Sequence, residues 1–561
     1  MRVLPSLTTL ACLTVATSAL AQTTPAAPPP PPPSTMRAPT PADLRRGEYG
    51  RYRANNDLRH YTLDVRVDPE AKTIAGSNQI RFTMLQDDTR IQLELYANFT
   101  IEAVTLDGAA AKHERTANTL YIDAPQTLRK GRTYTATVKY AGAPQEIGRF
   151  GGLAFRKDPA GRPWITTASE GEGSSVWWPS KDQWRDEPDE GIDIRVAVPN
   201  GLTDVSNGKF MRKTDLGDGY TRWDWRVHYP INSYNVSLNI AEYVHFSEML
   251  GDLPLDYYVL AGSLDKARVQ FAQAKPMIEA FQKYVGPYPF PKDGYKLIEV
   301  PYSGMEHQSA VTYGNRFANG YLERDWTGVG ISPKFDFIII HESGHEWFGN
   351  AVSAADVSDM WIHEGWTTYL ECVYVEALFG HDDALKYTNA YKKKIGNKEP
   401  VITQRGIHRD PTQDMYFKGA LFLHTLRGIV DDDARWWQLV RDTYTTFMYR
   451  NIMTEDLVRF FNQQLKQDLT PVFNQYLRRA ELPRLELTFD ATAGTVAYRW
   501  NAAEPGFAMP IKVGTPGHWK TVRPTADWQV LANPDGAAFT AATDLAYIDV
   551  VVLDANGVPV K

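Results

Sequence analysis

The chain has 561 residues, of which 43% are hydrophobic and 23% charged, so it is long enough for several domains and typical of folded globular proteins. Its 60 basic and 67 acidic residues give a formal net charge of −7. This small acidic excess argues against a phosphate-binding surface, and we expect no nucleic-acid partner.

The first 21 residues have the pattern of a secretory signal peptide. Arg2 precedes a short apolar run, VLPSLTTLACLTVATSAL, which ends in the small-residue cleavage pattern Ala19-Leu20-Ala21. The run is too short to span a membrane comfortably, and a proline-rich stretch follows it directly. We therefore expect cleavage after Ala21, export to a periplasm or beyond, and no membrane span in the mature chain.

Residues 22–47 are predicted to be a linker, because their proline-rich composition offers no apolar face to bury. Residues 48–247 are predicted to form an all-β domain. The segments YTLDVRV (61–67) and IRFTM (80–84) alternate apolar and polar side chains, and turn residues bound the later runs.

The pattern changes from alternation to helical spacing near residue 265. Residues 265–286 form one helical segment that ends at a glycine, and residues 332–350 begin with Ser-Pro and end with Gly-Asn. We therefore predict a mainly helical domain over residues 248–482. Short alternating segments then return and predict a small β-sandwich over residues 483–561.

Two features of the helical region are interpreted as structural. Cys372, the single cysteine that remains after export, lies in an apolar helical stretch where a free thiol usually packs in a core. The three lysines Lys392 to Lys394 are expected to form a solvated helix face.

A candidate metal site occupies residues 341–364. His341 and His345 are four positions apart, so on a helix both imidazoles project from one face, and zinc accepts imidazole nitrogen readily. With Glu342 between them they form the zinc-peptidase signature. Glu364 follows on a second helical segment, and an antiparallel helix pair would return its carboxylate to the histidines. Two histidines and one carboxylate leave a position open for water, so we predict one catalytic Zn²⁺ per chain.

These motifs resemble those of the gluzincin zinc aminopeptidases, the family of aminopeptidase N and leukotriene hydrolase. HESGH followed by WIHEGWTTYLE has the zinc pattern, GMEH is similar to the family's Gly-x-Met-Glu motif, and MYFKGA is similar to its Tyr-x-Lys-Gly motif. The resemblance covers about residues 58–480. It implies a saddle-like N-terminal β domain, a thermolysin-like catalytic domain, and removal of N-terminal residues from peptides.

The resemblance and the chemistry agree on the general base. Glu342 is placed to take a proton from water and pass it to the leaving amine. For Tyr416, the resemblance alone implies a hydroxyl that donates to the tetrahedral oxyanion. Asp359 matches a family aspartate and is a candidate to orient a metal ligand, although a helix N-cap explains it equally well.

The resemblance also implies how a peptide is held. Glu306 would capture the free α-amine of the substrate, while Gly304 and Met305 would lie along the peptide as an extended strand. A second acid usually shares amine recognition, and either Glu170 or Glu172 is a candidate, with a solvated loop as the alternative.

Two histidines depart from the family, which commonly has asparagine at both positions. We expect His307 to hydrogen-bond Glu306 or the substrate backbone, because a fourth protein ligand would close the metal site. The role of His363 is left open.

The leading interpretation is an exported zinc aminopeptidase acting on peptides with a free N-terminus. One alternative is a zinc endopeptidase of broader specificity, in which Glu306 has no amine to bind. Another is an exported peptide- or glycan-binding protein with a vestigial zinc site. The sequence specifies neither the oligomeric state nor the side chain preferred at the cleaved residue.

Overall fold

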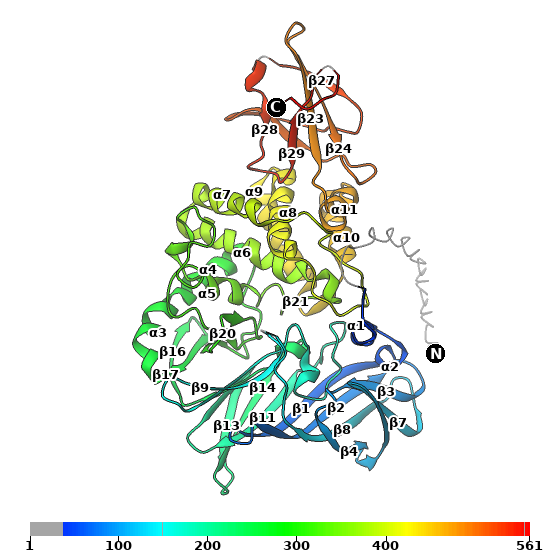
Figure 1. Cartoon of the computed structure of the whole chain (residues 1–561), viewed down its shortest axis with the longest axis vertical. Coiled ribbons are helices and arrows are strands. Elements are labelled where there is room, and N and C mark those ends of the chain that lie inside the picture. Colours follow the sequence, from blue (N-terminus) through cyan, green and yellow to red (C-terminus); the bar gives the residue numbers. More distant parts are fainter. Residues whose placement is uncertain (1–37, 149, 534, 555, 561) are drawn as a thin grey trace, which may run out of the picture.

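The computed structural model describes residues 38–560, except residues 149, 534 and 555. A β domain, a helical domain and a small C-terminal β domain follow one another along the long axis of the molecule (Figure 1). The predicted signal peptide and residues 22–37 of the predicted linker lie outside the described residues. Within the described part of the chain, no helix is long and apolar enough to cross a membrane.

An eight-stranded sheet dominates the N-terminal domain. Its strands, in spatial order, are β13 (Lys209–Asp215), β14 (Tyr220–Val227), β11 (Ile192–Pro199), β1 (Asn56–Asp68), β2 (Thr73–Met84), β8 (Thr133–Gly142), β4 (Thr100–Leu106) and β5 (Ala109–Ala110). Along β1, Tyr61, Leu63, Val65 and Val67 are buried and the residues between them are half-buried, as the alternating sequence predicts.

Two smaller sheets complete this domain. One contains β12 (Thr203–Ser206), β15 (Leu238–Ala241), β10 (Pro163–Ala168) and β9 (Gly152–Lys157), and the other contains β3 (Asp88–Glu94), β7 (Thr119–Leu128) and β6 (Lys112–Thr116). The predicted all-β fold of this domain is confirmed.

Part of the predicted linker is helical. Residues Pro41–Gly47 form α1, whose N-cap Thr40 and Asp43 exchange reciprocal hydrogen bonds with each other's backbone. A second short helix, α2 (Arg51–Ala54), leads into β1. The His408 N–H donates to the Asp43 carbonyl, so the segment around α1 contacts the helical domain as well as the β domain.

A five-stranded sheet opens the second domain. It contains β16 (Tyr243–Leu250), β17 (Leu253–Leu260), β18 (Tyr295–Glu299), β20 (Val311–Tyr313) and β19 (Gly304–Met305). The predicted domain boundary at residue 247 falls inside β16, which pairs with β17 along its whole length. The strand β19 lies at the sheet edge, and among the described strands it pairs with β20 alone.

Helices make up the rest of this domain. They are α3 (Leu264–Gln270), α4 (Ala274–Tyr284), α5 (Phe337–Gly344), α6 (Trp361–Phe379), α7 (His381–Ala390), α8 (Asp414–Val430), α9 (Asp433–Phe447), α10 (Thr454–Leu465) and α11 (Thr470–Arg478). The strand β21 (Val352–Ala354) lies between α5 and α6, and β22 (Arg450–Ile452) lies between α9 and α10. The two strands pair in parallel and so connect these two parts of the domain.

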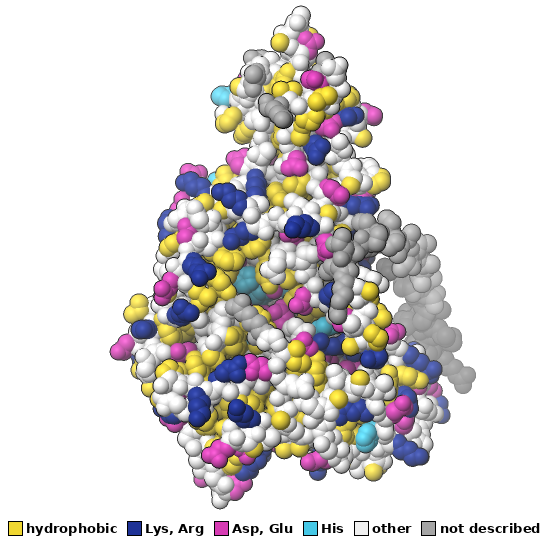
Figure 2. Space-filling model, viewed as in Figure 1, with side chains coloured by type: hydrophobic (Ala, Val, Ile, Leu, Met, Phe, Trp, Pro, Cys, Tyr) yellow, Lys and Arg dark blue, Asp and Glu magenta, His cyan; other side chains and the backbone are white. Residues whose placement is uncertain are grey.

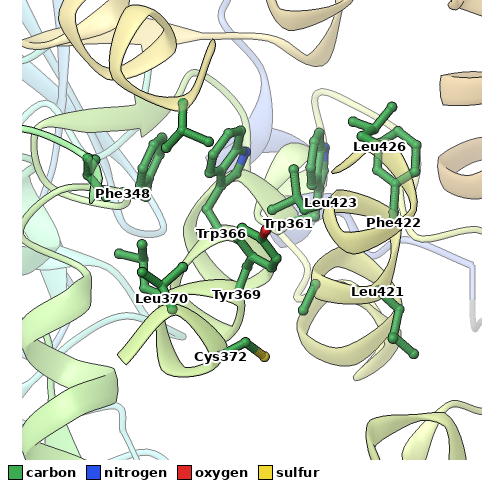
Figure 3. Close-up of a cluster of buried hydrophobic side chains, with 14 of the residues drawn as sticks. Phe348, Trp361, Trp366, Tyr369, Leu370, Cys372, Leu421, Phe422, Leu423 and Leu426 are labelled. Atoms are coloured by element: carbon green, nitrogen blue, oxygen red, sulfur yellow. The ribbon is translucent and has the colours of Figure 1, made fainter. Parts of the chain in front are cut away.

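The helices α6 and α8 pack against each other at the centre of the domain. Their buried side chains form one cluster that includes Trp361 and Phe422, whose ring centroids lie 5.9 Å apart (Figure 3). Where the helices cross, a methyl group on Gly419 would lie 2.8 Å from the Cα of Gly365, so this approach requires glycine. Cys372 lies in the same cluster as a free, buried thiol, and burial raises its pKa.

The helix that contains the zinc signature is shorter than predicted. Ser332–Lys334 form a 3₁₀ turn, and α5 begins at Phe337. Its N-cap is Asp336, whose carboxylate accepts hydrogen bonds from the backbone N–H of Ile338 and Ile339. The helix ends at Gly344, but His345 keeps helical backbone angles as the C-cap, so the i, i+4 relation of the histidines persists.

The C-terminal domain is a sandwich of two small sheets. One contains β27 (Gln529–Ala532), β24 (Thr495–Asn501), β23 (Arg484–Asp490) and β29 (Asp549–Val552), and the other contains β26 (His518–Val522), β25 (Ile511–Thr515) and β28 (Thr540–Ala541). The predicted three-part fold class is therefore confirmed.

Candidate active site

The three predicted metal ligands form a compact triangle. The Nε2 atoms of His341 and His345 lie 3.3 Å apart, and each lies 3.4 Å from Oε2 of Glu364. In a tetrahedral zinc centre with bonds of about 2.0–2.1 Å, ligand atoms are separated by about 3.3–3.4 Å. Among the described residues, Glu364 Oε2 has no hydrogen-bond partner. The donor set and its spacing therefore fit one Zn²⁺ ion.

The charges of these groups favour a cation at the same point. Burial alone would lower the pKa of His341, but its contacts with Glu364 and Glu371 raise it above the usual value. Burial would raise the pKa of Glu364, but His345 and His341 hold it well below the usual value. The site thus stabilises positive charge between the two imidazoles and the carboxylate, as binding of a divalent cation requires.

Hydrogen bonds behind the ligands fix the orientation of both imidazoles. His341 Nδ1 donates to Glu371 Oε1 at 2.7 Å, which turns Nε2 toward the metal position. Glu371 in turn accepts hydrogen bonds from Tyr387 and Tyr391. His345 Nδ1 lies 3.1 Å from the carbonyl oxygen of Phe348. The sequence analysis missed Glu371, although it lies two helical turns after Glu364 and thus on the same face of α6.

Asp359 does not have the predicted role. Its carboxylate binds Arg405 with distances of 2.7 and 2.8 Å and accepts a hydrogen bond from the Thr454 backbone N–H. No contact joins it to a metal ligand within the described residues, and the N-cap of α6 is Met360. Asp359 therefore links the start of α6 to α10, and the carboxylate that orients a ligand is Glu371.

The substitution Glu371→Gln is expected to weaken zinc binding by about 10–100-fold, because it replaces the charged partner of His341 with a neutral amide. Competition with a chelating dye measures the change. Glu376→Gln, on the same helix but paired with Arg427, is the matched control and should bind zinc as the wild type does. Equal zinc affinity in Glu371→Gln would contradict the orienting role.

Glu342 lies against the edge strand β19. A methyl group on Gly304 would come within 2.9 Å of Glu342 Cγ and 2.7 Å of Ile338 Cγ2, so glycine lets the strand pack directly on the Glu342 side chain. Burial raises the pKa of Glu342 to about 7, with Glu306 acting in the same direction and His341 against it. A carboxyl group with this pKa can accept and release a proton near neutral pH.

Tyr416 lies in the first turn of α8, beside the metal ligands. Its ring centroid is 6.1 Å from that of His341, and the close contact of α6 with α8 brings it there. Burial raises the pKa of Tyr416, and Glu364 and Glu170 raise it further. Its hydroxyl therefore keeps its proton and can donate a hydrogen bond.

The predicted site residues line one cavity of about 410 Å³. It lies between the helical domain and the N-terminal β domain, where Figure 2 shows acidic and histidine side chains in a hollow of the surface. Apart from Asp359, His307 and the alternative candidate Glu172, all of them contribute to its wall: Glu170, Gly304, Met305, Glu306, His341, Glu342, His345, Glu364 and Tyr416.

Two acids face this cavity beside the metal position. Glu306 is 3% exposed, and its Oε1 accepts a hydrogen bond of 2.9 Å from the hydroxyl of Tyr234. Glu170 Oε1 is buried and has no hydrogen-bond partner among the described residues. Burial raises the pKa of both carboxyl groups, and Glu306 raises that of Glu170 further. A cation bound between them would relieve this repulsion.

The structure distinguishes Glu170 from Glu172. Glu172 accepts a hydrogen bond from Tyr96, lies 3.7 Å from Arg46, and lines a separate cavity. Of the two candidates, Glu170 is the one that faces the metal ligands.

The two histidines that depart from the family pattern are both buried and neutral. His307 does not line the cavity, and within the described residues neither of its ring nitrogens has a hydrogen-bond partner. The predicted hydrogen bond between His307 and Glu306 is therefore wrong, and the position of His307 outside the cavity wall argues against the predicted contact with a substrate. His363 Nε2 accepts from the Ala354 N–H, and its ring stacks on Trp184 at 4.9 Å. Burial lowers the pKa of each histidine to about 3.

Trp184 connects His363 to Glu306 by way of Tyr234. Its ring also stacks on Tyr234 at 5.3 Å, and Tyr234 holds Glu306. Sequence analysis missed Trp184 and Tyr234, because both come from the N-terminal domain and reach the site only through domain packing.

The fold and the site together define a zinc-peptidase scaffold of the gluzincin type. Residues 58–235 match the Peptidase M1 N-terminal domain, and residues 269–476 match the Peptidase family M1 domain. The chain belongs to peptidase family M1, as the sequence motifs predicted.

The curated relatives are longer than this chain. It is 24% identical over 423 residues to human Endoplasmic reticulum aminopeptidase 1, covering 71% of this chain and 44% of the relative. It is 22% identical over 430 residues to mouse Aminopeptidase N, covering 70% and 44% of the two chains. The chain therefore spans about half the length of the curated relatives it matches.

Solved structures share the fold. An M1 zinc metallopeptidase from Deinococcus radiodurans superposes with a TM-score of 0.65 at 22% identity, covering 77% of this chain and 96% of that protein. A second structure from the same organism, described as bound to a Tyr-Ser-Ala substrate, gives a TM-score of 0.64 with the same coverage.

Proposed function

We propose that the protein is a zinc-dependent aminopeptidase that removes N-terminal residues from peptides. The observation that supports this most directly is the pair of acids, Glu306 and Glu170, that faces the cavity beside the metal ligands. An ammonium group about 3 Å from one carboxylate gains on the order of 5 kcal/mol before desolvation, at an effective dielectric constant near 20. Anchoring the α-amine there places the first peptide bond at the metal position.

The edge strand β19 supports binding of an extended peptide. One edge of β19 pairs with β20, and both Gly304 and Met305 line the cavity. A peptide can add to such an edge through main-chain hydrogen bonds, which do not depend on its sequence. The two acids that hold the α-amine, Glu306 and Glu170, would then determine which bond is cleaved.

The chemistry follows from the residues around this bond. Zinc, held by His341, His345 and Glu364, would polarise the peptide carbonyl and lower the pKa of water. Glu342 takes the proton of the attacking water and delivers it to the leaving amine. Tyr416 donates its hydroxyl to the oxygen that becomes negatively charged.

The comparisons support the same function. The relatives are named aminopeptidases, and one structural neighbour is described with a tripeptide substrate. We further propose that the protein is exported, on the basis of the N-terminal pattern up to Ala21. N-terminal sequencing of the native protein should then begin at Gln22, and an uncleaved Met1 would contradict export through this signal.

Matched peptides with free and acetylated N-termini test the proposed activity. The wild type should release the first residue of the free peptide and leave the acetylated peptide intact. Glu306→Gln should lower kcat/KM for the free peptide by at least about tenfold, because the amide cannot pair with the ammonium group. Glu172→Gln is the control, since Glu172 lines another cavity.

Other outcomes would support the alternatives. Internal cleavage of both peptides at similar rates indicates an endopeptidase. Cleavage of neither by zinc-loaded protein indicates a peptide- or glycan-binding role.

A further inference from the structure

Glu306 is held both at its side chain and at its backbone. Its Oε1 accepts a hydrogen bond of 2.9 Å from the Tyr234 hydroxyl, and its carbonyl oxygen accepts one of 2.8 Å from Asn350 Nδ2. Asn350 Oδ1 in turn accepts from Asn235 Nδ2 at 2.7 Å. Tyr234 and Asn235 are consecutive residues of one 3₁₀ turn, η2 (Ser233–Asn235), in the N-terminal domain. A single turn of one domain therefore fixes a candidate amine-binding acid of the next domain.

The Tyr234 hydroxyl donates to Glu306 and has no direct access to a substrate. Burial raises the pKa of Tyr234, and Glu306 raises it further, so the hydroxyl keeps its proton. Glu306 lines the cavity, whereas Tyr234 does not. Any effect of this hydroxyl on a bound peptide would therefore pass through the Glu306 carboxylate.

A stack of three rings fixes the Tyr234 ring relative to the metal site. The Tyr234 and Trp184 centroids lie 5.3 Å apart with an interplanar angle of 28°, and those of Trp184 and His363 lie 4.9 Å apart with an angle of 4°. His363 precedes the metal ligand Glu364, and its Nε2 accepts from a backbone N–H of β21. The stack thus links the Glu306 carboxylate to the first turn of α6, which contains Glu364.

The backbone contacts form a second link between Glu306 and the metal site. The Asn350 N–H donates to the carbonyl oxygen of the metal ligand His345 at 2.9 Å, and the Asn350 side chain binds the Glu306 carbonyl oxygen. The loop after Glu306 is held as well, because Asn207 Nδ2 donates to the Gln308 carbonyl oxygen at 2.8 Å. Glu306 is therefore fixed relative to two metal ligands before any substrate binds.

This fixed position determines what the carboxylate can recognise. A glutamate side chain that is free to rotate loses entropy when it binds an ammonium group. With Oε1 bound to Tyr234, the Glu306 carboxylate keeps one orientation beside the cavity, and its remaining lone pairs stay available. An ammonium group must then lie at a set distance from the metal position to reach them.

We propose that Tyr234 is a positioning residue for amine recognition, whose hydroxyl aims the Glu306 carboxylate at the α-ammonium group of the substrate. Through this residue the N-terminal domain contributes to the choice of the cleaved bond without touching the peptide. This inference rests on the proposed aminopeptidase function and deepens it, because it names the group that positions the amine-binding acid.

The test compares two zinc-binding inhibitors that differ only in the α-amine. Leucine hydroxamate has this amine and 4-methylpentanohydroxamate lacks it, so the ratio of their affinities measures amine recognition at equal metal chelation. Calorimetry measures binding of each to zinc-loaded wild type, Tyr234→Phe and Tyr257→Phe. Tyr257 is the matched control: it is also buried, its hydroxyl donates to Glu248 Oε1 at 2.8 Å, and neither of these two residues lines the cavity.

The wild type should bind leucine hydroxamate at least about 100-fold more tightly than the compound without the amine. Tyr234→Phe should lower this ratio about tenfold, because a hydrogen bond to a charged group is lost. It should leave the affinity for the compound without the amine unchanged, and Tyr257→Phe should keep the full ratio. In protein that also carries Glu306→Gln, Tyr234→Phe should lower the ratio no further, since its effect passes through Glu306.

An unchanged ratio in Tyr234→Phe, or equal weakening of both inhibitors, would overturn the inference and leave the aminopeptidase function intact. A further loss of the ratio in the Glu306→Gln protein would do the same, because Tyr234 would then act by another route. Equal affinity of the wild type for the two inhibitors would overturn both the inference and the proposed amine recognition.

Discussion

Replacing Glu342 with glutamine is expected to lower kcat by about 10²–10⁴-fold while zinc remains bound. The substitution keeps the shape of the side chain but removes its ability to accept a proton from water. Glu342 is not part of the ligand triangle of His341, His345 and Glu364, so the metal site should stay intact. Single-turnover kinetics together with metal analysis of the purified variant measure both effects.

Glu346→Gln is the matched control for this prediction. Glu346 is also buried, and burial raises its pKa to about 7, but it accepts hydrogen bonds from Tyr288 and from the Ser309 N–H, away from the cavity. Its variant should retain both zinc and turnover. Full activity in Glu342→Gln would exclude the base role, and loss of zinc from that variant would mean that Glu342 helps to hold the metal.

The metal ligands could be predicted from sequence because their geometry is mostly local. The i, i+4 spacing of His341 and His345 survives even though α5 ends before His345. The predicted start of this helix was wrong because the Ser-Pro signal at residue 332 produces only a 3₁₀ turn. Asp336 caps the true helix, and it is held by Tyr313, which is distant in sequence.

The groups that sequence analysis missed depend on packing between elements. Glu371 orients His341 only because α5 and α6 lie side by side. Tyr234 reaches Glu306 from another domain, and Trp184 of that domain stacks on Tyr234. Asp359 illustrates the opposite error. It lies close to Glu364 in sequence, yet its carboxylate binds Arg405 and the Thr454 N–H and contacts no metal ligand among the described residues.

The same limit affects the domain boundary and the lysines. β16 alternates as the preceding strands do, so only its pairing with β17 shows that it belongs to the catalytic domain. The uniform solvated face predicted for the three lysines is wrong, because Lys392 Nζ donates to a carbonyl oxygen of the C-terminal domain and Lys394 Nζ lies over the Trp326 ring, whereas Lys393 is exposed. Local periodicity indicates which residues are buried and does not specify their partners.

Replacing Tyr416 with phenylalanine is expected to lower kcat by about 10²–10³-fold with little change in KM. The phenylalanine ring can keep its place beside His341, so only the hydroxyl is lost. Since the raised pKa of Tyr416 keeps this hydroxyl protonated, its absence removes a hydrogen-bond donor and no charge. Tyr302→Phe is the control, because the Tyr302 hydroxyl already donates to the Thr167 carbonyl oxygen.

A phosphinic peptide, which mimics the tetrahedral geometry of the reaction, separates stabilisation of the transition state from binding of the substrate. If the Tyr416 hydroxyl acts on the developing oxyanion, Tyr416→Phe should weaken binding of this analogue by a factor similar to its loss in kcat/KM. The affinity for an intact substrate is measured in proteins that also carry Glu342→Gln, so that the substrate is not cleaved. Tyr416→Phe should change this affinity little. An unchanged kcat, or equal weakening of analogue and substrate, would instead make Tyr416 a residue that only shapes the cavity.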